Sequence, residues 1–154
     1  MNHLYENAAA GGTHFGFWYR IQSHPDGPSF TNSYCPNNVP LGIFRDNSAH
    51  TFGWYGLWIH KYPEGYFPKD GDAEHGYCNG HNHVQAVFER LTAWRCERGA
   101  EVVIGGSIQF RDFIMLDNEK AGMEVVESDG GYGIDGPGVY DGIVVGKRWR
   151  ERIF

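Results

Sequence analysis

Two tryptophans and two glutamates recur at the same distance from a glycine, and their side chains are ones that can bind or cleave a sugar. Trp18, Trp58, Glu101 and Glu124 each stand two residues after a glycine, between two apolar residues. Aromatic faces hold sugar rings through apolar contact, and two carboxylates about 5–5.5 Å apart are the geometry of retaining glycoside hydrolysis. If these positions stack, they predict a glycan-binding stripe with Glu101 and Glu124 as the catalytic candidates.

The same four residues also have a purely structural interpretation. Long loops can cover the tryptophans, and the glutamates can be ordinary solvated residues, because like charges on neighbouring strands destabilise a sheet. The pattern favours this structural role over glycan binding, and glycan binding over hydrolysis. No catalytic residue is therefore assigned, and enzyme activity stays an open alternative.

A second group of potential ligands is the cluster His75, Cys78, His81 and His83. Imidazole and thiolate bind zinc, which prefers four ligands, but the spacing matches no standard zinc module. A disulfide between Cys78 and Cys35 is the favoured alternative, because it would link two long loops whose closure costs entropy. We assign no metal and no cofactor, and we expect Cys96 to be a small buried hydrophobe.

Composition limits the remaining functions. The chain has 154 residues, a net charge of −6, 22 glycines and 16% aromatic residues. The acidic balance argues against a nucleic-acid partner, because such binders need a clustered basic face. No stretch approaches the ~20 apolar residues that cross a bilayer, so we expect no membrane span in this segment.

An internal repeat defines the elements that must position these side chains. Leu4, Phe44, Phe88 and Phe110 each open a short apolar strand, and a glycine-led strand follows about twelve residues later. The step from Phe88 to Phe110 is 22 residues, and the step from Phe44 to Phe88 is twice as long. A period this short, with two or three strands per unit, is typical of one coil of a parallel β-helix.

The repeat therefore predicts an all-β fold: a right-handed parallel β-helix of about five coils over residues 1–154, cut from a larger protein. Two long loop insertions, 20–42 and 61–85, interrupt the coils. Alternation places Leu57 and Ile59 inside and Trp58 outside. The repeated glycines are expected at sharp bends, because glycine tolerates positive φ.

A second predicted column lies at the other end of the repeat. It holds Glu6, Asp46, Arg90 and Asp112, which carry charges of both signs and are interpreted as a surface ladder of little energetic weight. Asn7 and Asn47 follow the strand starts and suit turns, where an amide can bond to nearby backbone. We expect structural roles for both sets.

Several motifs resemble those of one family. The runs NAAAGGTHFGFWY at residues 7–19, HPDGPS at 24–29 and VPLGIF at 39–44, followed by NSAH at 47–50, resemble the parallel β-helix region of the fibrocystin-L family. That region is related to the β-helix of the cell migration-inducing hyaluronan-binding protein and of the cell-surface hyaluronidase. The likeness runs from Asn7 to about Val125.

The resemblance implies a cell-surface, extracellular location, in a parent protein anchored by a single membrane span. It implies a non-catalytic interaction or structural module of a receptor or coat protein, with a glycosaminoglycan such as hyaluronan or an extracellular protein as partner. The alternative is a protein that binds or depolymerises hyaluronan, in the manner of a hyaluronidase-like glycoside hydrolase. The resemblance assigns no catalytic residue to a position of this sequence.

Overall fold

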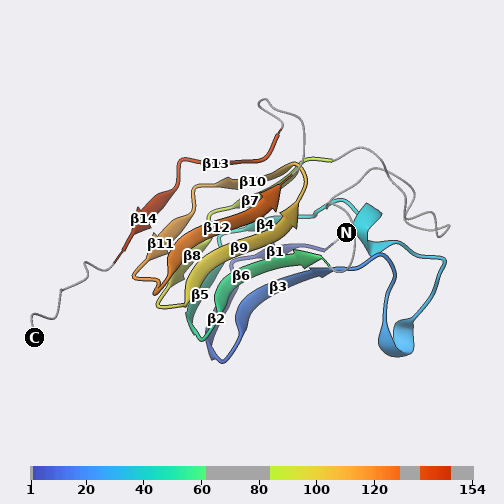
Figure 1. The fold of residues 1–154 in the computed structure, drawn as a ribbon, viewed down its shortest axis with the longest axis horizontal. Coiled ribbons are helices and arrows are strands. Elements are labelled where there is room, and N and C mark those ends of the chain that lie inside the picture. The colour runs from blue at the N-terminus through green and yellow to red at the C-terminus, as the bar shows by residue number, and fades with distance from the viewer. Residues whose placement is uncertain (1, 62–83, 129–135, 147–154) are drawn as a thin grey trace, which may run out of the picture.

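The structure is a computed structural model that describes residues 2–61, 84–128 and 136–146. Its strands run through the chain in repeating sets of three, and each strand pairs in parallel with its equivalent in the next coil (Figure 1). The predicted parallel β-helix is confirmed. The helices in the described ranges are two short 3-10 turns, so none has the length or apolarity of a membrane span.

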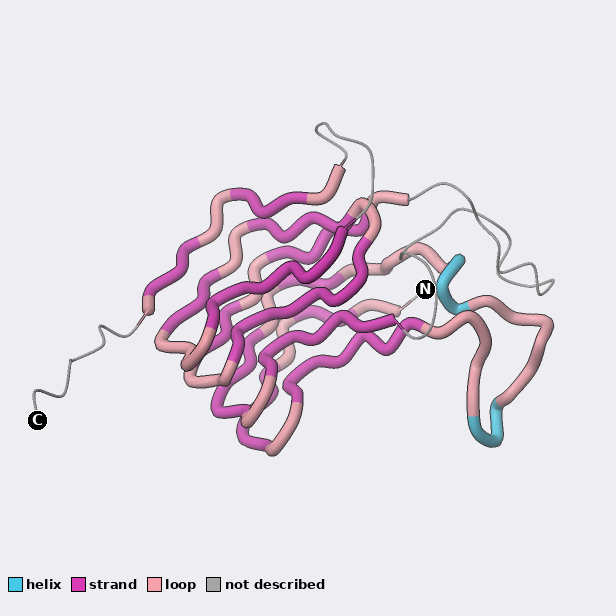
Figure 2. The backbone as a smooth tube through the Cα atoms, viewed as in Figure 1, coloured by secondary structure: helices cyan, strands magenta, loops and turns pink. Residues whose placement is uncertain are grey.

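Three parallel sheets form the sides of the β-helix (Figure 2). Sheet A contains β1 (Leu4–Tyr5), β4 (Phe44–Arg45), β7 (Ala86–Glu89), β10 (Ile108–Arg111) and β13 (Gly138–Tyr140). Sheet B contains β2 (Ala8–Gly12), β5 (Ser48–Phe52), β8 (Thr92–Trp94), β11 (Ile114–Leu116) and β14 (Ile143–Val145). Sheet C contains β3 (Phe15–Ile21), β6 (Tyr55–Lys61), β9 (Arg98–Gly105) and β12 (Ala121–Ser128).

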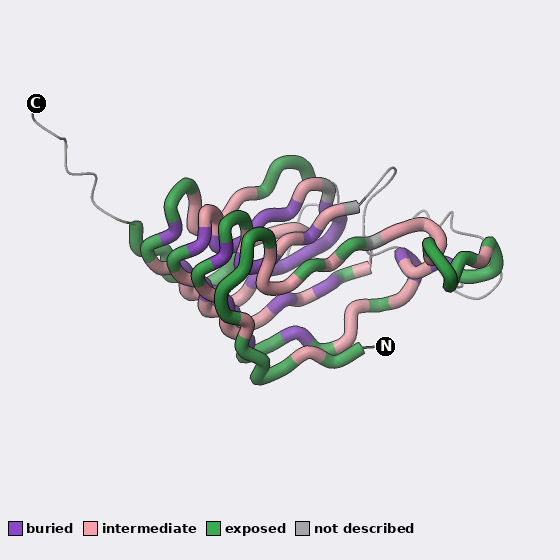
Figure 3. Tube along the Cα trace, turned by 90° about the horizontal axis from the view of Figure 1, so that it is seen from below, coloured by how far each residue is buried: buried purple, intermediate pink, exposed green. Residues whose placement is uncertain are grey.

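The core consists of columns of equivalent apolar side chains. Leu4 pairs with Phe44, Phe44 with Phe88, and Phe88 with Phe110, as the repeat predicts. The ring centroids of Phe44 and Phe88 lie 5.1 Å apart, and those of Phe88 and Phe110 lie 5.8 Å apart. Buried residues therefore follow the inside of the middle coils, between the less covered first and last ones (Figure 3), because the alternation of each strand is repeated one interstrand spacing further on.

The repeated glycines have a different cause from the predicted one. Positive φ among the described glycines is confined to Gly11 and Gly27, so Gly16, Gly56, Gly99 and Gly122 are not left-handed. Space explains them instead: a Cβ on Gly16 would lie 2.7 Å from the carbonyl oxygen of Gly56, and one on Gly56 would lie 2.6 Å from that of Gly99. Each coil thus approaches the next too closely for a side chain at this position.

One set of left-handed turns lies between sheets A and B and is made by residues other than glycine. A second set, at the ends of the sheet B strands, consists of Gly11, Thr51, Arg95 and Asp117. Glu6, Asp46, Arg90 and Asp112 all have φ between 49° and 57°. The Arg90 guanidinium bonds to both carboxylate oxygens of Asp46, at 2.5 and 2.9 Å. The predicted surface ladder is therefore also the corner at which each coil turns.

An asparagine ladder stabilises the same corner, as predicted. The Oδ1 atom of Asn47 accepts hydrogen bonds from the backbone N–H of Asn7 at 3.0 Å and from its side-chain amide at 3.1 Å. The Asn47 amide in turn donates to the carbonyl oxygen of Leu4 over 2.9 Å. These bonds satisfy a buried amide and tie the first coil to the second.

The two insertions leave the body at the ends of β3 and β6. The first begins later than predicted, because Arg20 and Ile21 still pair with β6. It carries the 3-10 turns η1 (Gly27–Ser29) and η2 (Pro36–Asn38) and extends away from the stacked coils (Figure 1). Most of the second predicted insertion, residues 62–83, lies outside the described residues.

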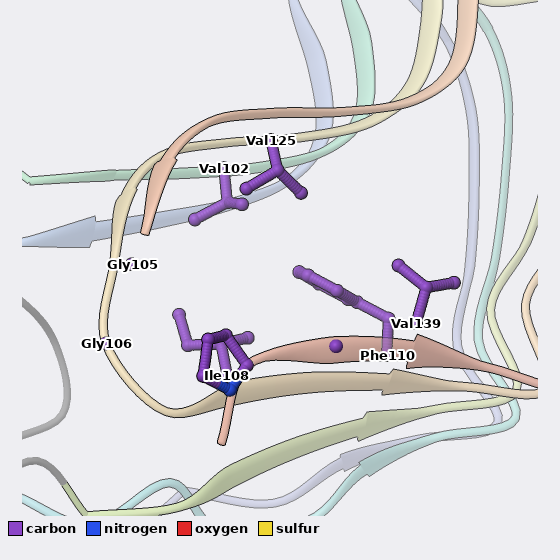
Figure 4. A pocket seen from close by; sticks show the side chains of 9 residues that line it. Val102, Gly105, Gly106, Ile108, Phe110, Val125 and Val139 are labelled. Carbon is purple, nitrogen blue, oxygen red and sulfur yellow. The ribbon is translucent and has the colours of Figure 1, made fainter. Parts of the chain in front are cut away.

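The last described coil leaves the core open. Sheets A and B continue through β13 and β14, whereas sheet C has no described strand beyond β12. A cavity of about 120 Å³ remains between the two walls, with Val102 and Val125 on one side and Ile108, Phe110 and Val139 on the other (Figure 4). Core side chains that a further coil would cover are therefore accessible: Val125 is 46% exposed and Val139 is 51% exposed.

Candidate functional site: the outer face of sheet C

The four predicted site residues form one column on the outside of sheet C. The register pairs Trp18 with Trp58, Trp58 with Glu101, and Glu101 with Glu124. The two indole rings stack with centroids 5.7 Å apart and an interplanar angle of 21°. Trp18 is 45% exposed and accessible to a ligand, whereas Glu101 is only 7% exposed.

Three more rings enlarge the tryptophan pair into an aromatic platform, which we define as Phe15, Trp18, Tyr55, Trp58 and His60. Around Trp58, Phe15 lies at 4.8 Å, Tyr55 at 5.3 Å and His60 at 4.7 Å, each within 18° of parallel. All five residues belong to β3 and β6. Near-parallel rings on adjacent strands present a broad apolar surface of the kind that sugar rings contact.

Sequence alternation did not identify Phe15 and Tyr55 as part of this surface. Phe15 stands two residues before the inward-facing Phe17, so a regular strand would place both on the same side. The break occurs at Gly16, where a Cβ would point inward against Ala49 and Phe52. The usable signal is that Phe15 and Tyr55 both directly precede a repeated glycine.

Glu101 lies beside Trp58 on the adjacent strand and fixes the edge of the platform. The indole Nε1–H of Trp58 donates to Oε1 of Glu101 over 2.9 Å. Burial raises the pKa of Tyr55, and the charge of Glu101 together with a hydrogen bond to it raises that pKa further. One buried carboxylate therefore orients two of the five rings, which is a positioning role.

A charged cluster continues the column onto β9 and β12, and we define it as Glu97, Arg98, Glu101, Lys120 and Glu124. Arg98 bonds to Glu124, forms an ion pair with Glu97 at 2.5 Å and lies 3.5 Å from Glu101. Lys120 forms a second ion pair with Glu97 at 3.0 Å. The hydrogen bond from Lys120 is the main cause that holds the pKa of Glu97 below its usual value.

This geometry suits binding better than hydrolysis. A retaining glycosidase needs one carboxyl group that protonates the leaving oxygen and a second that attacks the sugar. Here the same guanidinium lies against both Glu101 and Glu124, and Glu101 is turned toward Trp58 and largely covered. The arrangement can fix rings and neutralise charge without exposing a paired acid and nucleophile.

A cleft adjoins the platform at the first insertion. It has a volume of about 410 Å³ and is lined by Trp18, Arg20 and Tyr34, among others. The Arg20 guanidinium lies 5.5 Å from the Trp18 ring centroid and forms an ion pair with Asp26 at 3.0 Å. The insertion thus borders the platform at Trp18 and leaves this ring partly exposed.

The other predicted sites fall partly outside the described residues. Cys35 is disulfide-bonded, and Cys96 is a buried free thiol whose pKa is raised by burial. Cys78, His75, His81 and His83 lie outside the described ranges, so the Cys35–Cys78 pairing and the metal cluster stay predictions. Within those ranges, no group of three or more His, Cys, Asp or Glu residues is arranged to hold a metal ion.

Comparison with known proteins agrees with the resemblance inferred from the motifs. Residues 1–57 match the family model described as CEMIP beta-helix. Over 123 residues, or 80% of the chain, the sequence is 50% identical to mouse Fibrocystin-L and 48% identical to the human protein. It is 32% identical over 133 residues to human Cell surface hyaluronidase CEMIP2, a match that covers 76% of the chain.

The matched segment is a small part of these relatives. It spans 3% of the length of each Fibrocystin-L protein and 10% of CEMIP2. No solved structure matches the chain. The comparisons therefore bear on the β-helix, and the activities of the much longer relatives have to be tested on this chain directly.

Proposed function

This chain is a parallel β-helix homologue of Fibrocystin-L, and on that premise we propose that it is a non-catalytic interaction module of an extracellular, cell-surface protein. Its aromatic platform is the binding surface, and its ligand is a glycan. The observation that supports this most strongly is the stack of Phe15, Trp18, Tyr55 and Trp58 on the outside of the sheet. Contiguous apolar patches on a protein surface, unlike single exposed side chains, mark sites of ligand or partner binding.

Binding to soluble oligosaccharides tests this proposal. We expect the unaltered protein to bind chitohexaose or a hyaluronan hexasaccharide in isothermal titration calorimetry. Trp58→Ala should lower that affinity at least about tenfold, because it removes the central ring of the platform. Trp94→Ala is the matched control, since Trp94 stacks on His50 on the outer face of sheet B instead.

An unchanged affinity in Trp58→Ala, or equal losses in Trp58→Ala and Trp94→Ala, would contradict the proposed binding surface. Circular dichroism of both variants checks that the β-helix is intact. Because the indole of Trp58 also bonds to Glu101, Trp18→Ala provides a second variant that removes a platform ring without breaking that bond.

Hyaluronan depolymerisation is the second candidate function. It is supported by the name of CEMIP2, the hyaluronidase to which the chain is 32% identical, and by the pairing of Glu101 with Glu124. Incubation with high-molecular-weight hyaluronan followed by measurement of chain length tests it directly. Unchanged polymer, or equal cleavage by Glu101→Gln, Glu124→Gln and the unaltered protein, would exclude catalysis by this pair.

A further inference from the structure

We infer that the aromatic platform takes an uncharged, hydroxyl-rich glycan and discriminates against polymers that carry carboxylates. This inference rests on the proposed function and specifies the class of ligand. It follows from the charges and hydrogen bonds that border the platform, where the cations Arg20, Arg98 and Lys120 and the indole N–H of Trp58 already have partners within the protein.

The charge beside the platform is negative on balance. The charged cluster contains the carboxylates Glu97, Glu101 and Glu124 against the cations Arg98 and Lys120. Carboxylates thus outnumber cations, and the cluster directly continues the column of Trp18 and Trp58. A ligand lying along this column meets a negative edge, which repels anions.

The hydrogen-bond donors around the platform are already used within the protein. Arg98 and Lys120 are ion-paired within the cluster, and Arg20, at the other end of the platform, is ion-paired to Asp26. The indole N–H of Trp58 is also used, by Glu101. Of the Arg and Lys side chains described around the platform, none is left unpaired to receive a ligand carboxylate, which needs charge-assisted donors to replace its water.

The groups that a ligand can still contact are an acceptor and the aromatic rings. The Glu124 side chain is 41% exposed, so its carboxylate can accept hydrogen bonds from ligand hydroxyls. The rings beside it contact the apolar faces of sugars. Hydroxyl groups are donors as well as acceptors. A neutral sugar can therefore bond to Glu124 through its hydroxyls and contact the rings through its apolar faces, without bringing a charge of its own to the surface.

Two oligosaccharides of equal length provide the test. Chitohexaose and a hyaluronan hexasaccharide share N-acetylglucosamine rings, but hyaluronan carries a carboxylate on every second ring. We expect the naturally expressed protein to bind chitohexaose at least about tenfold more tightly in calorimetry at low salt. Added sodium chloride should strengthen hyaluronan binding, because it screens the repulsion, and should leave chitohexaose binding nearly unchanged.

Charge-removing variants locate the effect. Glu124→Gln should raise the affinity for the hyaluronan hexasaccharide several-fold, because it removes a negative charge next to the platform and releases part of Arg98. Asp112→Asn makes the same change in net charge at the corner between sheets A and B and should leave both affinities unchanged.

The outcomes separate this inference from the proposed function. Hyaluronan binding that is equal or tighter, that weakens with salt and that is lost in Trp58→Ala would overturn the discrimination against carboxylates and leave the platform as the binding surface. If neither oligosaccharide binds, the proposed function is overturned, and the inference with it. Preference for chitohexaose that is unaffected by Glu124→Gln would show that the charged cluster does not set specificity.

Discussion

Glu101 has a carboxylate that could act in catalysis, but in this structure it positions an aromatic ring. It is 7% exposed, accepts the Trp58 indole N–H at 2.9 Å and lies 3.5 Å from the Arg98 guanidinium. A buried carboxylate needs such partners, because an unpaired charge in the interior is costly. In return, the carboxylate fixes the ring that lies at the centre of the platform.

Substitution of Glu101 should therefore be visible at Tyr55. Glu101→Gln removes a negative charge and a hydrogen bond that both raise the pKa of Tyr55, so that pKa should fall toward the ordinary tyrosine value. NMR titration of protein labelled at the tyrosine ring carbons measures it, with Tyr55→Phe identifying the resonance. A Tyr55 pKa that stays the same or rises in Glu101→Gln would show that the carboxylate does not act on this ring.

Tyr19 should make stability depend on pH in the alkaline range. It packs against Phe44 and Phe88, with ring centroids 5.9 and 5.2 Å away, and burial raises its pKa from 10.0 to about 12. Its contribution to stability is present in full below pH 10 and is lost as the pH rises through about 12, because the unfolded chain releases the proton first.

Urea unfolding at a series of pH values tests this dependence. The free energy of unfolding should fall less steeply between pH 10 and 12 in Tyr19→Phe than in the unaltered protein. Other alkaline groups contribute equally to both proteins, so the difference between the two slopes isolates Tyr19. Identical slopes would mean that Tyr19 titrates as it does in the unfolded chain.

At the scale of elements, close approach between coils determines where glycine is required. The glycines at the start of the sheet C strands carry no positive φ. At Gly16, Gly56 and Gly99 the carbonyl oxygen of the next coil occupies the space of a side chain, and at Gly122 the side chain of Val144 does. The same position turns Phe15 and Tyr55 outward, so the glycine ladder both closes the coil and creates the platform.

Gly56→Ala should accordingly destabilise the protein by about 1–3 kcal/mol, the usual cost of overpacking. The new Cβ would lie 2.6 Å from the Gly99 carbonyl oxygen and 2.8 Å from the Ala93 Cβ. Gly146→Ala is the matched control, because nothing lies within 4 Å of a Cβ there. Chemical denaturation measures both, and equal stabilities of the two variants would argue against the close approach.

At the scale of the whole molecule, the end of the described β-helix can pair with strands of another chain. Among the described residues, no strand pairs with the outer edge of β12, and the inward side chains Val139 and Val144 of the last coil are 51% and 62% exposed. Unpaired edges bordered by apolar residues are templates for other strands. The exposed core and the free edge lie at the same end of the molecule.

The isolated 154-residue chain should therefore self-associate as its concentration rises. Val139→Lys places a charge beside the open cavity and should lower the mean mass in sedimentation velocity. Phe30→Lys, at a residue that is 62% exposed in the first insertion, is the control and should not. A monodisperse monomer at all concentrations would contradict the open end.

Sequence reasoning predicted those features that depend on periodicity. The stacking of Phe44 on Phe88 and the outward column of Trp18 and Trp58 follow from the repeat, because equivalent residues of a β-helix must lie one strand apart. It missed the outward turn of Phe15, since alternation assumes a regular strand. It also missed the contacts of Arg98 with the glutamates, because side-chain ion pairs depend on rotamers that no spacing encodes.

The claim that the outer face of sheet C is a binding surface is tested most directly by following the tryptophan indole N–H signals in an NMR titration with chitohexaose. We predict that the signals of Trp18 and Trp58, stacked on adjacent coils, shift together with a common binding curve. The signal of Trp94, on sheet B, should stay in place. Shifts confined to Trp94, or no shift of Trp18 and Trp58 at saturating ligand, would contradict the account.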